Sequence, residues 1–296
     1  MKVLITGGAG ILGRKLADLF VKNGDQARVF DLPQVDYSCF DGKTGIDVAK
    51  GDIRDKDTVK KAVAGVNVIL HLAALIPPAS EKDRKFTMAI NLGGTENLLE
   101  AARGTGTHFI LTSSVATYGD TSAEKPPVTV AHSQSALDIY AESKIQSERV
   151  TMASGLPYTI FRIAPIAVPE LMEPPAVWPY KAEQRVEFIN RDDVADALFA
   201  AAYSRAAQGK ILNLSGGKSW QMSGREYVGA LYKAMEYEIG DAVFSDKAGW
   251  FDWYCTEESQ RLLKYQNTPF PAFITKLRKN VEIAYGYSEA AGAAGA

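Results

Sequence analysis

The chain has 296 residues, of which 46% are hydrophobic, and a formal net charge of −2. This length allows a large buried core, and the nearly balanced charge gives no electrostatic basis for binding nucleic acid. No apolar run reaches membrane-spanning length, and the first predicted strand begins at residue 2, so we expect neither a membrane span nor a signal peptide.

The cysteines and histidines predict no disulfide framework and no metal site. Cys39 and Cys255 are the only cysteines, and the three histidines, His71, His108 and His132, lack the paired spacings of metal ligands. We therefore expect a reducing cytoplasm as the compartment and a structural role for the histidines.

The first predicted element is an apolar strand over residues 2–6, which runs into three evenly spaced glycines and then a helical pattern. Glycine lets the backbone turn sharply and lets a pyrophosphate approach the N–H groups, while the N-terminal end of the helix favours its negative charge. Strand, turn and helix in this order are the context required of a dinucleotide fingerprint. The predicted cofactor contacts at this turn are Gly7, Gly10, Ile11, Leu12 and Gly13.

Asp31 ends a second predicted strand, over residues 26–31. It stands at the spacing of the acidic residue that accepts both ribose hydroxyls, and it would repel a 2′-phosphate, so we predict NAD rather than NADP. Arg14 and Arg28 keep NADP as the alternative, because a basic side chain near the ribose could pair with the extra phosphate. A turn residue is the less favoured interpretation of Asp31.

A third strand is predicted over residues 46–52, with Asp52 at its carboxyl end, where ligands of open α/β sheets collect. We predict that Asp52 reaches the adenine amino group and that Ile53 packs on its ring. Alternatively, Asp52 or Asp55 caps a helix over residues 56–64. Both roles can hold, because they concern different residues.

Residues 67–74 form a nearly continuous apolar run, typical of a parallel strand buried on both faces. A rigid loop over residues 76–80 follows, as a wall of the substrate pocket. In the long helix predicted over residues 83–103, two adjacent glycines cost roughly 1 kcal/mol each, so close packing against the sheet is expected. The predicted cofactor contacts here are Leu72, Ala73, Ala74 and Asn91, and the predicted substrate contacts are Ile76 and Pro77.

Tyr140 and Lys144 lie four residues apart in a helix predicted over residues 136–154, so they share one face. A phenol titrates near 10, and lowering its pKa by about 3 units takes roughly 4 kcal/mol, which a nearby ammonium and an oxidised nicotinamide can supply. Tyr140 would then take a proton from a substrate hydroxyl while hydride leaves the same carbon. Ser114, at the end of a strand over residues 107–113, would hydrogen bond to the reacting oxygen. Taken alone, the Tyr140/Lys144 spacing would be better explained as a solvated helix face.

Together these motifs resemble the extended short-chain dehydrogenase/reductases of the NAD-dependent epimerase/dehydratase group. The resemblance covers roughly residues 1–215. It rests on the following residues: Thr6-Gly7-x-x-Gly10-x-x-Gly13, Asp31, Gly51-Asp52-x-Arg54, His71-Leu72-Ala73-Ala74, Asn91-x-x-Gly94-Thr95-x-Asn97-Leu98-Leu99-Glu100-Ala101, Ser113-Ser114, Tyr140-x-x-Ser143-Lys144 and Asp193-Val194-Ala195.

The resemblance implies a doubly wound, Rossmann-type parallel sheet with a smaller, mostly helical C-terminal substrate subdomain. It implies Ser114, Tyr140 and Lys144 as catalytic residues. It also implies cofactor contacts at Tyr140, Lys144 and Ile163, with Lys144 on the nicotinamide ribose. A homodimer through the helices at 83–103 and 136–154 is a further implication of the family.

Three departures from the family pattern limit this resemblance. Pro165 stands where sugar-nucleotide enzymes usually carry asparagine, and it offers neither an N–H nor an amide side chain. The basic residue expected before Phe188 is either Arg185, displaced by one position, or missing. Val115 and Ala116 stand where sugar dehydratases carry Asp-Glu, which disfavours dehydration. The remaining predicted substrate contacts are Ser114, Val115, Pro165 and Arg185.

We predict an NAD-binding domain over residues 1–165 and 185–215 and a substrate-binding subdomain over 166–184 and 216–289. Residues 290–296 are low in complexity and read as a flexible tail. An aromatic cluster at residues 250–255 is more often core than pocket lining, and we predict core.

Three functions are consistent with these residues. The first is an NAD-dependent epimerase acting on a sugar or sugar nucleotide, which oxidises a carbon and returns the hydride to its other face. The second is a net dehydrogenase or reductase of a smaller hydroxy or carbonyl compound, which Pro165 favours. The third, a nucleotide sensor without catalysis, is disfavoured by the intact Ser114, Tyr140 and Lys144.

Overall fold

The computed structural model describes residues 1–286, and the predicted tail at 290–296 lies outside this range. The centre of the fold is a seven-stranded sheet of order β10-β6-β5-β4-β1-β2-β3, in which every neighbouring pair is parallel. This confirms the predicted doubly wound, Rossmann-type sheet. Its strands are β1 (Lys2–Thr6), β2 (Gln26–Asp31), β3 (Ile46–Lys50), β4 (Val68–His71), β5 (His108–Ser114), β6 (Tyr158–Ile163) and β10 (Lys210–Leu214).

The strand order reverses between β1 and β4. From β1 the chain adds β2 and β3 on one side, and from β4 it adds β5, β6 and β10 on the other. The two central strands lie in register, with Thr6 opposite His71 at their carboxyl ends. In open parallel sheets the crevice outside this reversal point is where ligands bind. The predicted site residues at the ends of β1, β2, β4 and β5 therefore meet at one edge.

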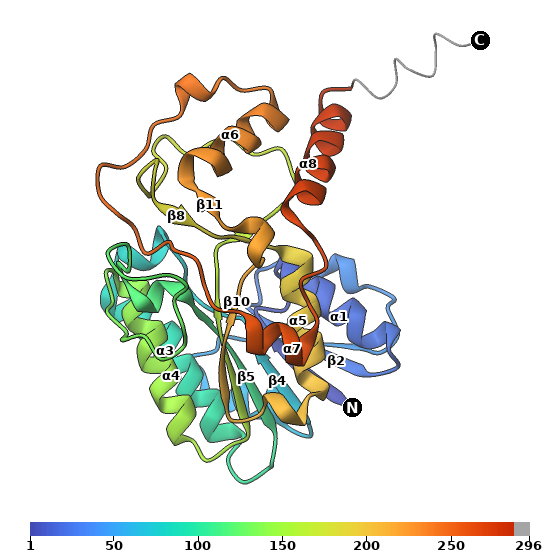
Figure 1. Cartoon of the computed structure of the whole chain (residues 1–296). Helices are drawn as coiled ribbons and strands as arrows, with labels where there is room; N and C mark the ends of the chain where they lie inside the picture. Colours follow the sequence, from blue (N-terminus) through green and yellow to red (C-terminus); the bar gives the residue numbers. More distant parts are fainter. Residues whose placement is uncertain (287–296) are drawn as a thin grey trace, which may run out of the picture.

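Helices cover both faces of the sheet (Figure 1). One face carries α1 (Ile11–Lys22), α5 (Arg191–Tyr203) and the short α7 (Glu257–Leu263), and the other carries α2 (Lys56–Val63), α3 (Arg84–Ala101) and α4 (Ile139–Ala153). Asp55, Asp83 and Asp138 precede α2, α3 and α4 and accept backbone amides from their first turns. Such capping satisfies N–H groups that the helix itself leaves unpaired, which explains where these helices begin.

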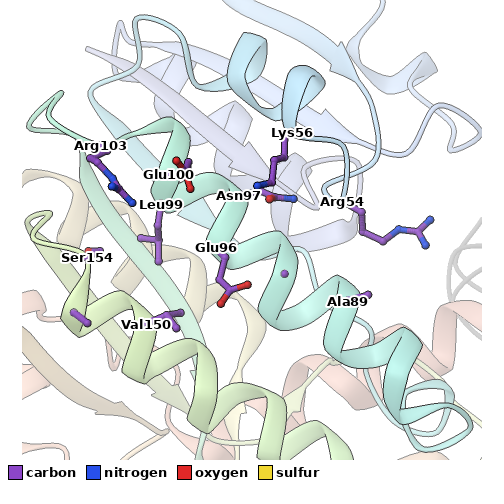
Figure 2. Close-up of a pocket in the computed structure, with 12 residues that line it drawn as sticks. Arg54, Lys56, Ala89, Glu96, Asn97, Leu99, Glu100, Arg103, Val150 and Ser154 are labelled. Carbon is purple, nitrogen blue, oxygen red and sulfur yellow. The ribbon is translucent and has the colours of Figure 1, made fainter.

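The outer faces of α3 and α4 enclose a groove of about 640 Å³ (Figure 2). Its floor includes Leu99 of α3 and Val150 of α4, and its walls carry charged side chains such as Glu96, Glu100 and Arg103. Arg54 and Lys56, which follow β3, also line this groove.

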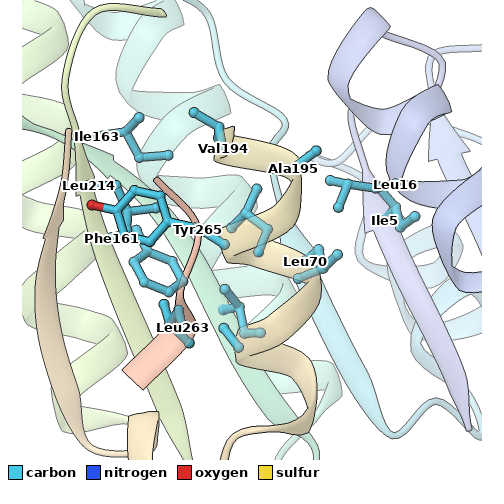
Figure 3. Close-up of a cluster of buried hydrophobic side chains, with 14 of the residues drawn as sticks. Ile5, Leu16, Leu70, Phe161, Ile163, Val194, Ala195, Leu214, Leu263 and Tyr265 are labelled. Atoms are coloured by element: carbon cyan, nitrogen blue, oxygen red, sulfur yellow. The ribbon is translucent and has the colours of Figure 1, made fainter. Parts of the chain in front are cut away.

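A cluster of buried apolar side chains joins α1 and α5 to the sheet (Figure 3). Leu70 of β4 and Phe161 of β6 pack with Val194 of α5, and Leu16 of α1 packs with Ile5 of β1. Each fully buried aliphatic side chain of this size contributes about 1.5–3 kcal/mol to folding. This packing holds both ends of the glycine turn between β1 and α1.

A second group of elements stands above the carboxyl edge of the sheet (Figure 1). It contains α6 (Gly224–Met235), α8 (Phe270–Ala284) and an antiparallel pair, β8 (Arg185–Val186) with β11 (Met222–Ser223). A short parallel pair joins β7 (Ile166–Ala167), which follows β6 in the sequence, to β9 (Ile189–Asn190), which precedes α5. The group has its own core, in which the rings of Phe188 and Tyr227 stack with centroids 4.0 Å apart.

The predicted helices near residues 224–236, 256–265 and 273–285 correspond to α6, α7 and α8. However, Leu263 of α7 and Tyr265 belong to the buried cluster of the sheet, beside α5, and not to the core of the second group. The predicted domain boundaries stay a proposal. In that proposal we now assign α7 and Tyr265 to the NAD-binding domain, because they pack in the core of the sheet. Among residues 1–286, no helix combines the length and apolar composition needed to cross a bilayer.

Candidate active site

The glycine turn between β1 and α1 leaves no room for side chains at two positions. A Cβ on Gly13 would lie 2.6 Å from the Cα of Gly8, and a Cβ on Gly8 would lie 2.6 Å from the carbonyl oxygen of Ile5. Gly7 adopts a φ of +66°, a conformation that favours glycine. The turn therefore requires glycine at Gly8 as well as at the predicted positions. Gly8 was not predicted, because it does not belong to the Gly-x-x-Gly spacing.

The N-terminal end of α1 is open to an anion. Its cap residue, Gly10, has no side chain to accept a hydrogen bond, and the first turn contains no acidic residue. The first amides of a helix lack partners within it, and they carry the positive end of its dipole. The turn therefore fits the pyrophosphate of a dinucleotide, with the amides of Ile11, Leu12 and Gly13 at the helix start.

Asp31 holds the glycine turn to the end of β2. Its carboxylate accepts the amide of Ala9 at 3.1 Å and the amide of Leu32 at 2.8 Å, and it lines a cavity of about 530 Å³. The same cavity is lined by residues at and after the ends of β1, β2, β3 and β4 and by two residues of α3: Gly7, Phe30, Leu32, Gln34, Gly51, Asp52, Ile53, Arg54, Leu72, Ala73, Ala74, Leu75, Ile76, Phe86 and Ile90.

Arg14 and Arg28, whose positive charge left NADP as the alternative cofactor, each hydrogen bond to other groups of the protein. The Nε of Arg14 donates to the carbonyl oxygen of Ala9 at 2.5 Å. Arg28 pairs with Asp47 at 2.7 Å and donates to carbonyl oxygens at the end of α2, the nearest being that of Ala62 at 2.8 Å. Neither guanidinium lines the Asp31 cavity. The arginine that does line this cavity, Arg54, is paired with Asp52 at 2.5 Å, which is consistent with the predicted choice of NAD over NADP.

Two roles were predicted for the acidic residues after β3, a helix cap and a cofactor contact, and the structure places different residues in the two positions. Asp55 caps α2, accepting the amides of Asp57 and Thr58 at 2.9 and 3.1 Å. Asp52 lines the cavity and pairs with Arg54, whose hydrogen bonds hold the pKa of the Asp52 carboxyl below its usual range.

Ile53 also lines this cavity, and its side chain leaves no space for a Cβ at one of the two adjacent glycines of α3. A Cβ on Gly94 would lie 2.7 Å from Cγ2 of Ile53. We expected close packing of these glycines against the sheet, but the contact is with the loop after β3. Gly93 has no such neighbour, since the nearest atom to its Cβ position is 3.9 Å away.

A second cavity, of about 400 Å³, contains the predicted catalytic residues. It shares Leu72, Ala74 and Ile76 with the Asp31 cavity, so the two form one cleft along the carboxyl edge of the sheet. Its other lining residues are Leu12, Pro77, Thr112, Ser113, Ser114, Tyr140, Lys144, Ile163, Ala164, Pro165, Ile166 and Trp250.

Ser114, Tyr140 and Lys144 meet within this second cavity. The Lys144 Nζ donates to the carbonyl oxygen of Thr112 at 2.7 Å and lies 5.6 Å from the centroid of the Tyr140 ring. Burial raises the pKa of Tyr140 to about 12, against the opposing effect of a hydrogen bond with Ser114. Burial lowers the pKa of Lys144 to about 8, against the attraction of the Glu148 carboxylate. The phenol and the ammonium are thus both poorly solvated in their charged forms.

Three of the predicted contacts line neither of these cavities, and their roles in the site stay predictions. Asn91 lines neither cavity: it is buried, its Oδ1 accepts the amide of Leu75 at 2.7 Å, and its Nδ2 donates to the hydroxyl of Ser143 at 2.9 Å. Val115 is fully buried in the core of the sheet. Arg185 lines a separate cavity of about 220 Å³, where it pairs with Asp252 at 2.5 Å.

His71 lies at the carboxyl end of β4, and its structural role stays a prediction. His71 is buried, with Nδ1 2.8 Å from the Thr6 hydroxyl and Nε2 2.9 Å from the Thr95 hydroxyl. Burial lowers its pKa to about 3, so the ring is neutral. Within residues 1–286, no group of three or more His, Cys, Asp or Glu side chains could hold a metal ion.

The family model that matches this sequence is that of the 3-beta hydroxysteroid dehydrogenase/isomerase family, over residues 4–156. The chain belongs to this family. The matched segment is more than half of the chain and contains the glycine turn, Asp31, Ser114, Tyr140 and Lys144.

Curated relatives in this family match the same part of the chain. A protein of Mycobacterium tuberculosis (strain CDC 1551 / Oshkosh), named 3 beta-hydroxysteroid dehydrogenase/Delta 5-->4-isomerase, is 33% identical over 161 residues, which are 52% of this chain and 43% of the relative. A Monkeypox virus protein of the same name is 31% identical over 159 residues, 51% of this chain and 45% of the relative. The match thus covers less than half the length of these relatives.

Solved structures resemble the whole chain. A short-chain dehydrogenase/reductase superfamily protein from Agrobacterium tumefaciens, with bound NAD, has a TM-score of 0.81 at 18% identity, covering 98% of this chain and 99% of that one. The dTDP-glucose 4,6-dehydratase DesIV from Streptomyces venezuelae has a TM-score of 0.83 at 20% identity, covering 97% and 98%. A UDP-glucose 4-epimerase from Thermotoga maritima has a TM-score of 0.81 at 17% identity, covering 96% and 100%. At these identities they establish the shared fold.

Trp250 lines the cavity of Tyr140, which the sequence did not predict. It was assigned to the core with its aromatic neighbours, and Phe251 and Tyr254 are indeed buried. Trp250 is only partly buried, lines the Tyr140 cavity and packs against the cores of both the sheet and the second group. Nothing in its sequence neighbourhood distinguishes it from Phe251, on whose ring it stacks with centroids 4.2 Å apart.

Proposed function

We propose that the protein is an NAD-dependent enzyme that transfers hydride at a carbon bearing a hydroxyl or carbonyl oxygen. The observation that carries this proposal is that Ser114, Tyr140 and Lys144 line a cavity continuous with the cleft of Asp31 and the glycine turn. A hydride acceptor and a proton acceptor can therefore work on one substrate carbon. The NAD found in solved relatives of the same fold supports the choice of cofactor.

The chain offers a contact for each part of NAD. The open N-terminal end of α1 would hold the pyrophosphate, Asp31 the adenosine ribose, and Lys144 the nicotinamide ribose. When bound, NAD supplies the hydride acceptor. The residues we assign to the cofactor are Gly7, Gly8, Gly10, Ile11, Leu12, Gly13, Asp31, Asp52, Ile53, Leu72, Ala73, Ala74, Tyr140, Lys144 and Ile163.

The proton is handled by three side chains. The Ser114 hydroxyl orients the reacting oxygen and hydrogen bonds to the phenol of Tyr140. The Tyr140 oxygen takes the proton from the substrate hydroxyl. Lys144, whose pKa of about 8 leaves it mostly charged at neutral pH, stabilises the resulting phenolate.

Two outcomes of this step are proposed. An epimerase acting on a sugar or sugar nucleotide would return the hydride to the other face, as expected of a chain with the fold of the UDP-glucose 4-epimerase. A net dehydrogenase or reductase of an uncharged hydroxy compound is favoured by the cavity itself. Its walls include Ile76, Pro77, Pro165 and Trp250, and Lys144 is the one cationic side chain among its lining residues. That lining offers little to a diphosphate.

A turnover assay with NAD separates these outcomes. Purified protein is incubated with NAD and either UDP-glucose or a 3-beta-hydroxysteroid, and both the reduced-nicotinamide absorbance and the products are followed. Net NADH formation with the steroid supports the dehydrogenase, and a 4-epimer formed without net NADH supports the epimerase. Bound NAD with no conversion of these or of a panel of secondary alcohols would argue against hydride transfer.

A homodimer and a cytoplasmic location stay proposals carried over from the sequence. The groove along α3 and α4 is the surface that we assign to the second copy, because the partly buried Val150 and the charged side chains of Glu96, Glu100 and Arg103 line it (Figure 2). Sedimentation equilibrium of the purified protein measures the assembly, and a monomer at micromolar concentration would contradict it.

A further inference from the structure

Glu81 joins the wall of the catalytic cavity to the helix that carries Tyr140. It ends a short turn, η2 (Ala79–Glu81), just after the loop of Ile76 and Pro77. Its Oε2 accepts the backbone amide of Ile139 at 2.9 Å, and its Oε1 accepts the backbone amide of Tyr140 at 3.1 Å. These amides begin α4, where no carbonyl of the helix can pair with them.

The first turn of α4 already has a cap of its own. Asp138 accepts the amide of Ala141 at 2.6 Å, which is the usual arrangement of a capping residue. Glu81 adds a second carboxylate from a segment 58 residues away in the sequence. A helix that needed only a cap would not require this distant partner. The extra bonds fix the position of the first turn relative to the cavity.

The segment that presents Glu81 is itself anchored. The Ser80 hydroxyl donates to Oε1 of Glu81 at 2.7 Å, and Ser80 is completely buried. The Ser80 amide donates to the carbonyl oxygen of Ile76 at 3.1 Å, while its own carbonyl accepts the hydroxyl of Thr87 in α3 at 2.7 Å. The carboxylate therefore stands on a fixed base between the cavity wall and α3.

We propose that Glu81 is a positioning residue, which holds the backbone of Tyr140 so that its phenol stays on Ser114 in the catalytic cavity. Tyr140 is the second residue of α4, where helices fray first, and a misplacement of about 1 Å can cost about 100-fold in rate. The inference rests on the proposed role of Tyr140.

Two substitutions of Glu81 and one matched control test this role. Glu81→Ala removes both acceptors, whereas Glu81→Gln keeps the side-chain length and one acceptor oxygen. Glu226 is the control, since its carboxylate accepts the amide of Ser223 at 2.8 Å at the start of α6, which carries no proposed site residue. Both alanine variants lose a carboxylate from a helix start, so similar losses of thermal stability are expected.

Catalysis should separate the variants. With a substrate found by the turnover assay, kcat of Glu81→Ala should fall about 10- to 100-fold, with the Kd for NAD unchanged and Glu81→Gln between it and the wild type. Glu226→Ala should keep the wild-type kcat. Equal kcat in Glu81→Ala and the wild type would overturn the proposal, as would equal losses in the Glu81 and Glu226 variants.

A spectroscopic measurement decides the matter without any substrate. In protein labelled with ¹³C at the tyrosine ring, the Tyr140 signal is the one missing from Tyr140→Phe. That signal should move in Glu81→Ala and, less, in Glu81→Gln, and should stay in place in Glu226→Ala. An unmoved signal overturns the role of Glu81 even if the chain transfers no hydride, and Glu81→Gln carries the test if the alanine variant does not fold.

Discussion

Replacing Tyr140 with phenylalanine removes one oxygen and keeps the ring, so it isolates the proposed proton acceptor. That oxygen hydrogen bonds to Ser114 and has a pKa raised to about 12 by burial. Losing one neutral hydrogen bond costs about 0.5–1.5 kcal/mol of unfolding free energy, so the fold should persist. A general base contributes about 10²- to 10⁴-fold to the rate, which equals about 3–5 kcal/mol of activation free energy. We expect a loss of kcat of this size with nearly unchanged NAD affinity.

The assay is NADH formation with the substrate identified by turnover, beside calorimetric titration with NAD and thermal unfolding. Tyr118→Phe is the matched control, because the Tyr118 hydroxyl is also buried and donates to Oδ1 of Asn213 at 2.6 Å, outside the cavity. It should unfold somewhat earlier and turn over normally. Activity of Tyr140→Phe within about tenfold of the wild type would refute the assignment of the base.

Three further predictions concern the cofactor cleft and a buried carboxyl. Asp31→Ala should weaken NAD binding about 10- to 100-fold and NADP binding less, by calorimetric titration, and equal losses would exclude the ribose contact. Gly13→Ala should weaken NAD binding more than about tenfold, because its Cβ would lie 2.6 Å from the Cα of Gly8. Gly93→Ala is the control, since the nearest atom to its Cβ would be 3.9 Å away, and it should leave NAD binding unchanged and raise the melting temperature. Burial raises the pKa of Glu187 from 4.5 to about 7, so the folded state holds its proton more tightly than the unfolded chain. The unfolding free energy of the wild type, relative to Glu187→Gln, should therefore fall by about 3 kcal/mol as the pH rises from about 4.5 through about 7, and a pH-independent difference would contradict this.

The features that the sequence predicted well are local ones. The glycine turn is fixed by neighbours within a few residues, and Tyr140 and Lys144 lie one helical turn apart, so spacing alone reports their geometry. The sheet follows from the same logic, since helices connect most of its successive strands, although β2 and β3 are joined by a segment with only the short turn Ser38–Phe40. Asp55 could be recognised as a cap because its partners are the next residues in the chain.

The features that escaped prediction depend on partners far away in the sequence. Asn91 belongs to the family pattern, but its amide bonds to Leu75 and Ser143, which lie 16 and 52 residues away. Arg185 lines a separate cavity, where it pairs with Asp252, 67 residues further on. Glu81 has no motif around it, because the amides that it accepts come from a helix that folding brings to it. Such contacts exist only once the tertiary structure is complete.

Trp250 has a thermodynamic consequence, because one side chain touches the catalytic cavity and both hydrophobic cores. A ligand that packs on its indole adds free energy to the same contact that joins the sheet to the second group of elements. Substrate binding and the cohesion of the two halves are therefore linked, and each must strengthen the other by the same amount.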